Sequence, residues 1–197
     1  WVGSDYKLLL FNPIEETFSV DSTLDAICGV QSLSYDDNNL WIASESGIYR
    51  WDMTSPPVRY KFDDIHEDAV ARVLLHDSNG NIWLGLGAGI HRYIKETDTF
   101  IYYDLPVDHE VTAICECERD VLLIGTDKGA AFLFNNSGRG TCAQVAQIDS
   151  RIHDFHSETG GRNILIGSDA GLFIYDKVLR RVVRSTDELA HQSIYRF

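Results

Sequence analysis

The sequence predicts an all-β protein built from β-propeller blades, and a repeat along the whole chain is the first reason. A segment of the type Trp-Ile-Gly-Ser starts at residues 1, 41, 83, 123 and 165, which lie 40, 42, 40 and 42 residues apart. Short apolar segments bounded by turn-forming residues fill each interval, without the roughly 3.6-residue periodicity of a helix. Four short strands in a repeat of about 40 to 45 residues are typical of a propeller blade.

Each repeat is expected to hold four strands, A to D in chain order. Strand A carries an apolar pair three residues apart, as in Val30 with Leu33, Val70 with Val73, Val111 with Ile114, Ile152 with Phe155 and Ile194 with Phe197. Strand B is the recurring segment, and a polar hairpin turn such as residues 77–81 precedes it. Strand C follows a glycine six residues after the start of strand B, at Gly47, Gly89, Gly129 and Gly171, with Lys7 in the first unit. Strand D is marked by Phe18, Val58, Phe100 and Val182.

These strands divide the chain into four full blades and two part-blades. The expected units are a part-blade at 1–29, blades at 30–69, 70–110, 111–151 and 152–193, and a trailing first strand at 194–197. The two part-blades are complementary, so they would close a ring of five blades and remove its exposed edges. The alternative is a section of a larger, seven-bladed ring. We favour the section because the chain begins abruptly at Trp1, without an initiator Met.

The composition argues against several kinds of partner. The chain has 30 acidic and 17 basic residues, a formal net charge of -13, which repels nucleic-acid backbones and anionic membrane surfaces. We therefore expect no nucleic acid to bind this segment. No apolar stretch approaches the roughly 18 residues that a membrane-spanning helix needs. The four cysteines are too few for a disulfide-dense scaffold and lack the C-x-x-C spacing of a zinc site, and their redox state stays open.

The repeat resembles the two-component-regulator propeller repeat. Its fullest copy runs from Val70 through the turn at 77–81 and the strand Ile82-Trp83-Leu84-Gly85 to Tyr93. The resemblance covers essentially the entire chain. It is weaker where Leu123 replaces Trp and where Gly138-Arg139-Gly140 replaces an apolar strand D.

That resemblance implies the periplasmic sensor region of a hybrid two-component system of the Bacteroidetes type, in which propellers recognise oligosaccharides. The implied function is a non-catalytic sensing module that transmits ligand occupancy to a histidine kinase. The implied parent protein is anchored in the inner membrane, and the implied partners are the remaining propeller blades and the kinase of the same polypeptide. This chain contains no kinase nucleotide motif, so kinase activity would belong to other segments. A homodimer, the number of blades and the direction of signalling stay open.

The residues themselves point to binding and give little sign of chemistry. The seven histidines show no metal-binding spacing, and no nucleophile elbow or nucleotide-binding loop occurs, so we expect no catalytic residue, metal or cofactor. Propellers usually bind ligands on the face formed by the B-to-C turns and the D-to-A connections. The candidates for an oligosaccharide or other small ligand on that face are Tyr6, Lys7, His66, His109, Asp127, Lys128, Arg151 and His191. Lys7, Lys128 and Arg151 are the cationic candidates for an acidic sugar.

Two other functions stand as alternatives. An enzyme of the lyase or lactonase propeller type would need metal ligands that converge at the mouth of the central channel. A protein-interaction scaffold would need an exposed apolar patch in place of a polar pocket. The sensing module is the leading hypothesis because the sequence shows no regular set of metal ligands.

Overall fold

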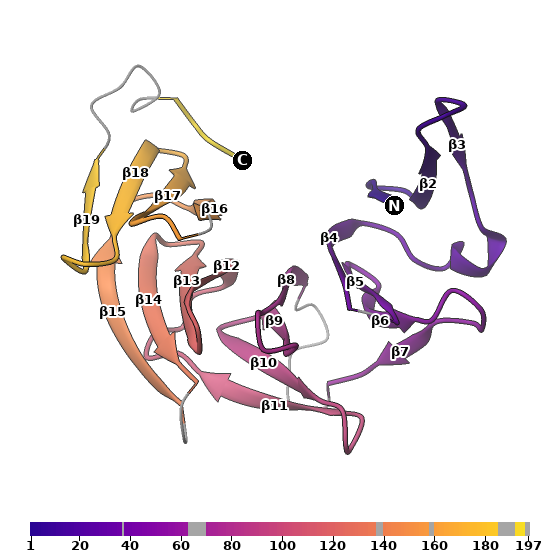
Figure 1. The fold of residues 1–197 in the computed structure, drawn as a ribbon, viewed down its shortest axis with the longest axis horizontal. Coiled ribbons are helices and arrows are strands. Elements are labelled where there is room, and N and C mark those ends of the chain that lie inside the picture. The colour runs from indigo at the N-terminus through magenta and orange to yellow at the C-terminus, as the bar shows by residue number, and fades with distance from the viewer. Residues whose placement is uncertain (37, 63–69, 137–139, 158–159, 185–191, 196–197) are drawn as a thin grey trace.

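The computed structural model describes residues 1–36, 38–62, 70–136, 140–157, 160–184 and 192–195. In this part of the chain, the backbone forms five antiparallel sheets, one short 3-10 turn, η1 (Ser22–Leu24), and no α-helix (Figure 1). The first sheet has three strands and the other four have four strands each. The predicted all-β propeller-blade fold is therefore confirmed.

Every sheet follows the chain order of its strands. The first contains β1 (Val2–Gly3), β2 (Leu8–Asn12) and β3 (Thr17–Ser19). The second contains β4 (Val30–Tyr35), β5 (Leu40–Ser44), β6 (Gly47–Trp51) and β7 (Val58–Tyr60). The third contains β8 (Ala71–His76), β9 (Ile82–Leu86), β10 (Gly89–Ile94) and β11 (Thr99–Asp104). The fourth contains β12 (Val111–Glu118), β13 (Val121–Thr126), β14 (Ala130–Asn135) and β15 (Thr141–Gln147). The fifth contains β16 (Ile152–Ser157), β17 (Asn163–Ser168), β18 (Gly171–Asp176) and β19 (Arg181–Arg184).

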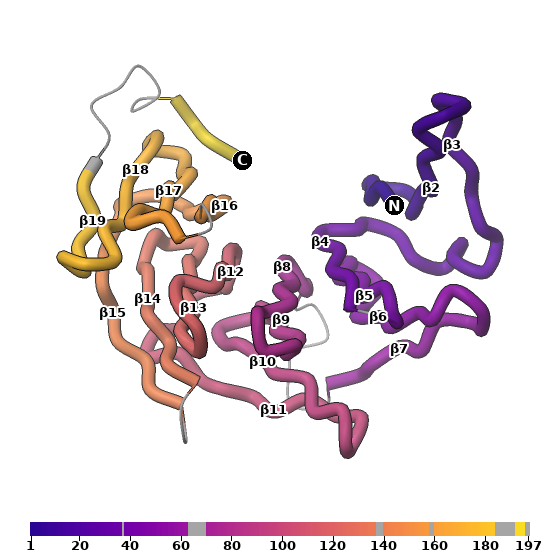
Figure 2. The backbone as a smooth tube through the Cα atoms, viewed as in Figure 1, coloured from indigo at the N-terminus to yellow at the C-terminus, as the bar shows by residue number. Residues whose placement is uncertain are grey.

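The five sheets stand side by side along an open arc (Figures 1 and 2). Strands β4, β8, β12 and β16 lie on the inside of the arc, and β7, β11, β15 and β19 lie on the outside. A buried hydrophobic cluster fills each of the four seams between neighbouring sheets. Each of the three middle sheets is thus covered by neighbours on both faces, and each of the two end sheets on one face.

A closed ring of five blades is not formed by the described residues. Strand β1 pairs only with β2, and no fourth strand joins the first sheet. Ile194 and Tyr195, in the expected trailing strand, adopt no strand structure, and residues 196–197 lie outside the described residues. The Ile194 backbone N–H instead donates to the Ser168 carbonyl at 3.0 Å. The segment therefore continues from the fifth sheet, and the first sheet stays apart across the opening (Figure 1).

In the third sheet, the apolar pair of the inner strand is Ala71 with Leu74, one residue later than the expected Val70 with Val73. Ala71 pairs with Leu86, three residues after the anchor Trp83, just as Val111 pairs with Thr126 in the fourth sheet. Both pairs have the same spacing, so the apolar pattern alone does not distinguish them. The hydrogen-bond register between β8 and β9 distinguishes the two pairs, because it buries Leu74 and leaves Val73 partly exposed.

The tryptophan anchors of the second and third sheets are each held by an aspartate in the preceding turn. The Trp41 indole N–H donates to Asp36 Oδ2 at 2.8 Å, and the Trp83 indole N–H donates to Asp77 Oδ2 at 2.8 Å. An asparagine side chain, Asn81 in the second case, donates to the same carboxylate. In the fourth sheet Leu123 takes the anchor position, so there is no indole N–H for a turn aspartate to accept.

Neighbouring sheets approach most closely at the third residue of strand B. A Cβ atom added at Gly125 would lie 2.6 Å from Ile152 Cγ2 of the next sheet, and one added at Gly85 would lie 2.6 Å from Val111 Cγ1. Gly3 with Val30 and Gly167 with Ile194 repeat this arrangement. Only the second sheet has a larger residue there, Ala43, and the buried first residue of the next inner strand is then the small Ala71. The two positions are complementary in size at every seam.

This complementarity predicts a coupled pair of substitutions. Gly125→Ala should destabilise the protein by about 1–3 kcal/mol, because the new methyl group overpacks the seam against Ile152. In the Ile152→Ala background the same substitution should cost much less, since the pair then matches Ala43 and Ala71. Urea unfolding of the four proteins of this double-mutant cycle measures the coupling. Additive effects would show that the two positions do not determine the spacing of the sheets.

Burial at the seam between the second and third sheets lowers the pKa of His91 to about 4. The side chain is 3% exposed, and its ring centroid lies 5.1 Å from that of Phe62 and 5.0 Å from that of Tyr102. Its Nδ1 atom has no hydrogen-bond partner among the described residues. The folded protein therefore holds this imidazole in the neutral form.

We predict that stability falls as the pH falls through the interval between the ordinary histidine pKa of about 6.5 and the folded value. The unfolded chain gains a proton at His91 in that interval and the folded chain does not. Between about pH 7 and pH 5, the wild type should lose on the order of 2 kcal/mol more than His91→Phe does. Urea unfolding at both pH values tests this, with a substitution of the exposed His156 as the control. An equal pH dependence in wild type and His91→Phe would contradict the assignment.

Candidate functional site

The face predicted to bind ligand carries the B-to-C turns and the D-to-A connections of all the sheets, and we call it the rim face. Antiparallel strand order brings these loops to the same ends of the strands. Tyr6, Lys7, His109, Asp127, Lys128 and Arg151 lie in such loops, between the strands that the structure forms. His66 and His191 lie outside the described residues.

Every four-stranded sheet has a β-bulge at the same point of its inner strand, immediately after the first residue of the apolar pair. The pairing register shifts there in β4, β8, β12 and β16, and the residues that the strand ladder passes over are Gln31, Arg72, Thr112 and His153. Bulges re-aim a side chain and are common next to binding sites. Sequence reasoning missed these four residues, although in each unit a polar residue directly follows the first apolar residue of the inner strand.

The bulge residues connect their own sheets to rim-face loops and to the next sheet. Arg72 Nε lies 2.8 Å from Glu110 Oε2, in the connection that leads to the fourth sheet; the two atoms form a close ion pair without hydrogen-bond alignment. The Thr112 hydroxyl donates to the Ile152 carbonyl of the fifth sheet at 2.6 Å. His153 Nε2 lies 2.7 Å from Asp169 Oδ1, and its ring centroid is 4.6 Å from that of Tyr195.

Arg72, Glu110 and Arg151 form what we call the rim cluster, and they come from three successive sheets and their connections. Glu110 Oε2 is 2.8 Å from Arg72 Nε and 3.9 Å from Arg151 Nη2. The three side chains are 30%, 28% and 31% exposed. Two guanidinium groups share one carboxylate, so the cluster keeps N–H donors that face solvent. It is locally cationic in a chain of net charge -13.

Asp127 fixes the position of Glu110 in this cluster. The Glu110 backbone N–H donates to Asp127 Oδ1 at 3.0 Å, and the Asp127 backbone N–H donates to the Glu110 carbonyl at 2.9 Å. Lys128 Nζ is 3.7 Å from Asp127 Oδ2 and is largely exposed. Next to Glu110 in the chain, His109 has a buried Nδ1 atom without a hydrogen-bond partner among the described residues. The structure thus brings four of the predicted residues, His109, Asp127, Lys128 and Arg151, to one part of the rim face.

Tyr6 and Lys7 belong to a different part of the molecule. Both lie between β1 and β2, across the opening of the arc from β16 (Figure 1). Tyr6 is 83% exposed, and Lys7 Nζ makes an exposed ion pair with Asp25 Oδ1 at 3.3 Å. These two residues do not join the rim cluster in this structure.

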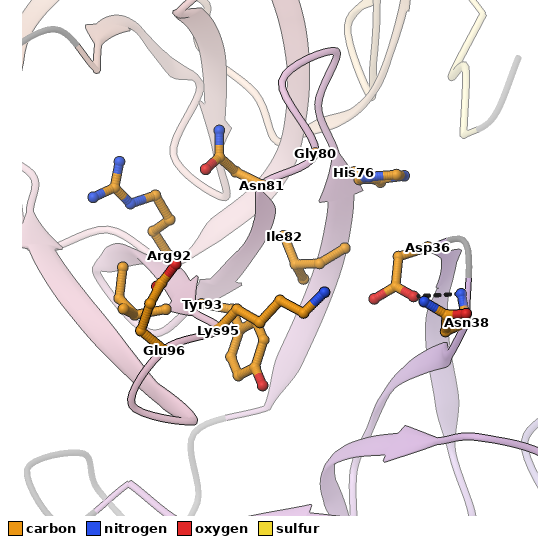
Figure 3. A pocket seen from close by; sticks show the side chains of 11 residues that line it. Asp36, Asn38, His76, Gly80, Asn81, Ile82, Arg92, Tyr93, Lys95 and Glu96 are labelled. Atoms are coloured by element: carbon orange, nitrogen blue, oxygen red, sulfur yellow. Dashed lines mark hydrogen bonds between the residues drawn. The ribbon is translucent and has the colours of Figure 1, made fainter.

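A second candidate site lies on the opposite face, which carries the A-to-B and C-to-D turns. It is a cleft of about 420 Å³ between the second and third sheets (Figure 3). Asp36 and Asn38 border it on one side, and His76, Asn81 and Lys95 on the other. The remaining lining residues are Gly80, Ile82, Arg92, Tyr93, Ile94 and Glu96. None of these residues is among the binding residues predicted from the sequence.

Three of the four cysteines are not activated nucleophiles. Burial raises the pKa of Cys115 well above its usual range, and it raises the pKa values of Cys117 and Cys142 to about 11. All four cysteines are free thiols in this structure. Among the described residues, no three His, Cys, Asp or Glu side chains are grouped closely enough to hold a metal ion. The polar side chains of both candidate sites can interact with a ligand through hydrogen bonds and ion pairs.

Comparison with known proteins gives matches to solved structures. No protein-family model matches the sequence, and no curated protein sequence matches it. The extracellular domain of the hybrid two-component system BT4673 from B. thetaiotaomicron aligns with 98% of this chain, with a TM-score of 0.84 and 20% identity. This chain spans 28% of the length of that domain.

Other solved structures align less completely. Virginiamycin B lyase from Staphylococcus aureus has a TM-score of 0.64 and 14% identity, over 76% of this chain and 53% of the lyase. PorZ, a surface component of the type-IX secretion system of Porphyromonas gingivalis, has a TM-score of 0.64 and 16% identity, over 86% of this chain and 28% of its own. At these identities the likeness is one of fold. The expected resemblance to the propellers of a hybrid two-component system is thus confirmed at the level of the fold.

Proposed function

We propose that this chain is a non-catalytic ligand-sensing part of a two-component sensor, which recognises an oligosaccharide and signals its occupancy to a histidine kinase outside the chain. The observation that carries the proposal is the alignment of 98% of the chain with the extracellular domain of a hybrid two-component system. The rim cluster adds a polar surface suited to a small ligand. The same alignment supports an extracytoplasmic location, which we propose to be the periplasm, in a parent protein anchored in the inner membrane.

The rim cluster has the properties that a sensing site needs. Arg72 comes from the third sheet, Glu110 from the connection to the fourth, and Arg151 from the connection to the fifth. A ligand that bonds to all three would therefore contact groups whose separation depends on how the sheets are spaced. A ligand shifts an equilibrium between two states only when it binds them differently. A ligand that contacts several sheets at once would bind one spacing of the sheets more tightly than another.

The proposed partners are the ligand, further propeller blades and the kinase of the same polypeptide, with a homodimer as an additional arrangement. The described residues include no helix that is long and apolar enough to cross a membrane. The first sheet leaves Val2 42% exposed, whereas the equivalent Ile42, Leu84, Ile124 and Ile166 are 0% exposed under a preceding sheet. An additional blade would suit this face.

Ligand binding should raise the melting temperature of the chain in the presence of one class of neutral or acidic oligosaccharide. A ligand at about ten times its Kd stabilises the native state by roughly 1.4 kcal/mol, which corresponds to about 3–6 °C for a domain of this size. The rise should not need a divalent metal. It should be at least halved in an Arg72→Gln, Arg151→Gln variant and kept in Lys61→Gln, a change at an exposed lysine outside the cluster.

Differential scanning fluorimetry with and without divalent metal separates the alternatives. Stabilisation that appears only with metal would contradict the proposal and favour a lyase-type propeller enzyme. A flat response across the whole panel would favour a scaffold that binds a protein partner. Circular dichroism of the variants before the screen ensures that a lost response reflects lost binding.

A further inference from the structure

The cleft lies on the face that carries the A-to-B and C-to-D turns, and it differs from the equivalent place between the third and fourth sheets. Between the third and fourth sheets, side chains of the two turns bond directly to each other, and we call this contact the clasp. The Ser78 hydroxyl donates to Glu116 Oε1 at 2.6 Å, and the Asn79 amide donates to Asp120 Oδ1 at 2.9 Å. Arg119 Nε donates to Asn79 Oδ1 at 2.8 Å. The clasp leaves these polar groups satisfied within the protein.

The corresponding positions at the cleft are polar but unpaired. Asn38 corresponds to Asn79, because the backbone N–H of each donates to the Oδ1 atom of the turn aspartate. His76 corresponds to Glu116, because each pairs with the residue just before the anchor of its sheet, Ile82 and Leu122 respectively. Within the described part of the chain, the Asn38 and His76 side chains have no hydrogen-bond or ion-pair partner.

Two charged side chains, Lys95 and Glu96, complete the unpaired set. Figure 3 shows Lys95 extending from the C-to-D turn into the space between the two sheets, with Asp36 and Asn38 on the far side. Neither Lys95 nor Glu96 has a partner among the described residues. The Asp36 carboxylate is occupied by the Trp41 indole N–H and by N–H groups of its own turn.

These groups suit a neutral polyhydroxyl ligand. One ammonium and one carboxylate balance in charge, and an amide and an imidazole add both donors and acceptors. A hydroxyl group both donates and accepts, so the hydroxyl groups of a sugar can pair with each of these kinds of group. An anion would meet Glu96 and Asp36, and a cation would meet Lys95 and Arg92, so the lining as a whole is also balanced in charge. The volume of about 420 Å³ falls in the roughly 300–1,000 Å³ range of small-molecule sites.

We propose that the cleft between the second and third sheets binds a neutral saccharide ring, whose hydroxyl groups replace the protein clasp found at the next seam. The bound ring joins Asn38 of the second sheet to His76 and Lys95 of the third. This site is separate from the rim cluster and lies on the opposite face. The proposal for the cleft does not depend on the proposed sensing role.

A titration of the ¹⁵N-labelled chain, followed by ¹H–¹⁵N NMR, tests the site without knowledge of the natural ligand. The probes are the methyl glycosides of glucose, galactose, mannose and xylose, at up to about 50 mM because single sugar rings bind with millimolar affinity. At least one probe should shift the amide signals of Asn38, Gly80 and Asn81, together with the side-chain amide of Asn38. A His76→Ala, Lys95→Met variant should bind at least about tenfold more weakly, the equivalent of 1.4 kcal/mol.

Lys61→Met is the matched control and should leave the titration unchanged. Lys95→Met alone serves as the test if the double variant fails to give a dispersed spectrum, because Lys95 is exposed and unpaired. The proposal is overturned if none of the four glycosides shifts the cleft signals, or if the shifts persist in the variants. Shifts confined to Arg72, Glu110 and Arg151 would overturn it while leaving the sensing role intact.

Discussion

The close approach of each sheet to the next, through a small residue of strand B that is glycine in every sheet but the second, is the contact on which the rest of the structure depends. At this point the inner strand of one sheet lies so near its neighbour that Gly125 and Ile152 leave no room for another methyl group. Farther out, aromatic side chains such as Trp41, Tyr60 and Phe100 fill the second-to-third seam. Small residues inside and large residues outside make each seam a wedge, and a series of wedges bends the sheets into an arc.

The close packing of neighbouring sheets also determines where the polar groups of the rim face lie. The backbone N–H at the start of the next inner strand donates back to the preceding sheet, from Val30 to the Ser4 carbonyl at 3.2 Å and from Val111 to the Gly87 carbonyl at 2.8 Å. These bonds fix the D-to-A connections against the B-to-C turns. A bulge residue can then reach the following connection, as Arg72 reaches Glu110. The rim cluster is therefore a consequence of how the sheets stack.

Much of the fold was predictable because the repeat reflects constraints on the local backbone that are the same in each blade. The strand B segments and the turn glycines depend on backbone conformation and short-range hydrogen bonds, and they recur at nearly fixed spacing. The inner strand of the third sheet was misplaced by one residue, since Val70 with Val73 and Ala71 with Leu74 have equal spacing. Only the ladder register, a contact between strands, separates the two.

The candidate sites were harder to predict than the fold. Four of the rim-face residues named from the sequence do gather around Glu110, because loops that follow equivalent strands must share a face. Arg72 was missed because a bulge is invisible to apolar periodicity, and Tyr6 and Lys7 were grouped with residues that lie across the opening. The cleft was missed for a different reason. Asn38 and Asn79 occupy the same place in the repeat, and only the packing of the next sheet decides which one is bonded.

A crystal structure of the chain with the oligosaccharide that stabilises it most, grown without divalent metal, tests the central claim most directly. The account predicts an intact saccharide on the rim face, with polar contacts to Arg72, Glu110 or Arg151. A cleaved or rearranged sugar would contradict a non-catalytic role. Density for the sugar only at places remote from both the rim cluster and the cleft would contradict the assignment of the sites.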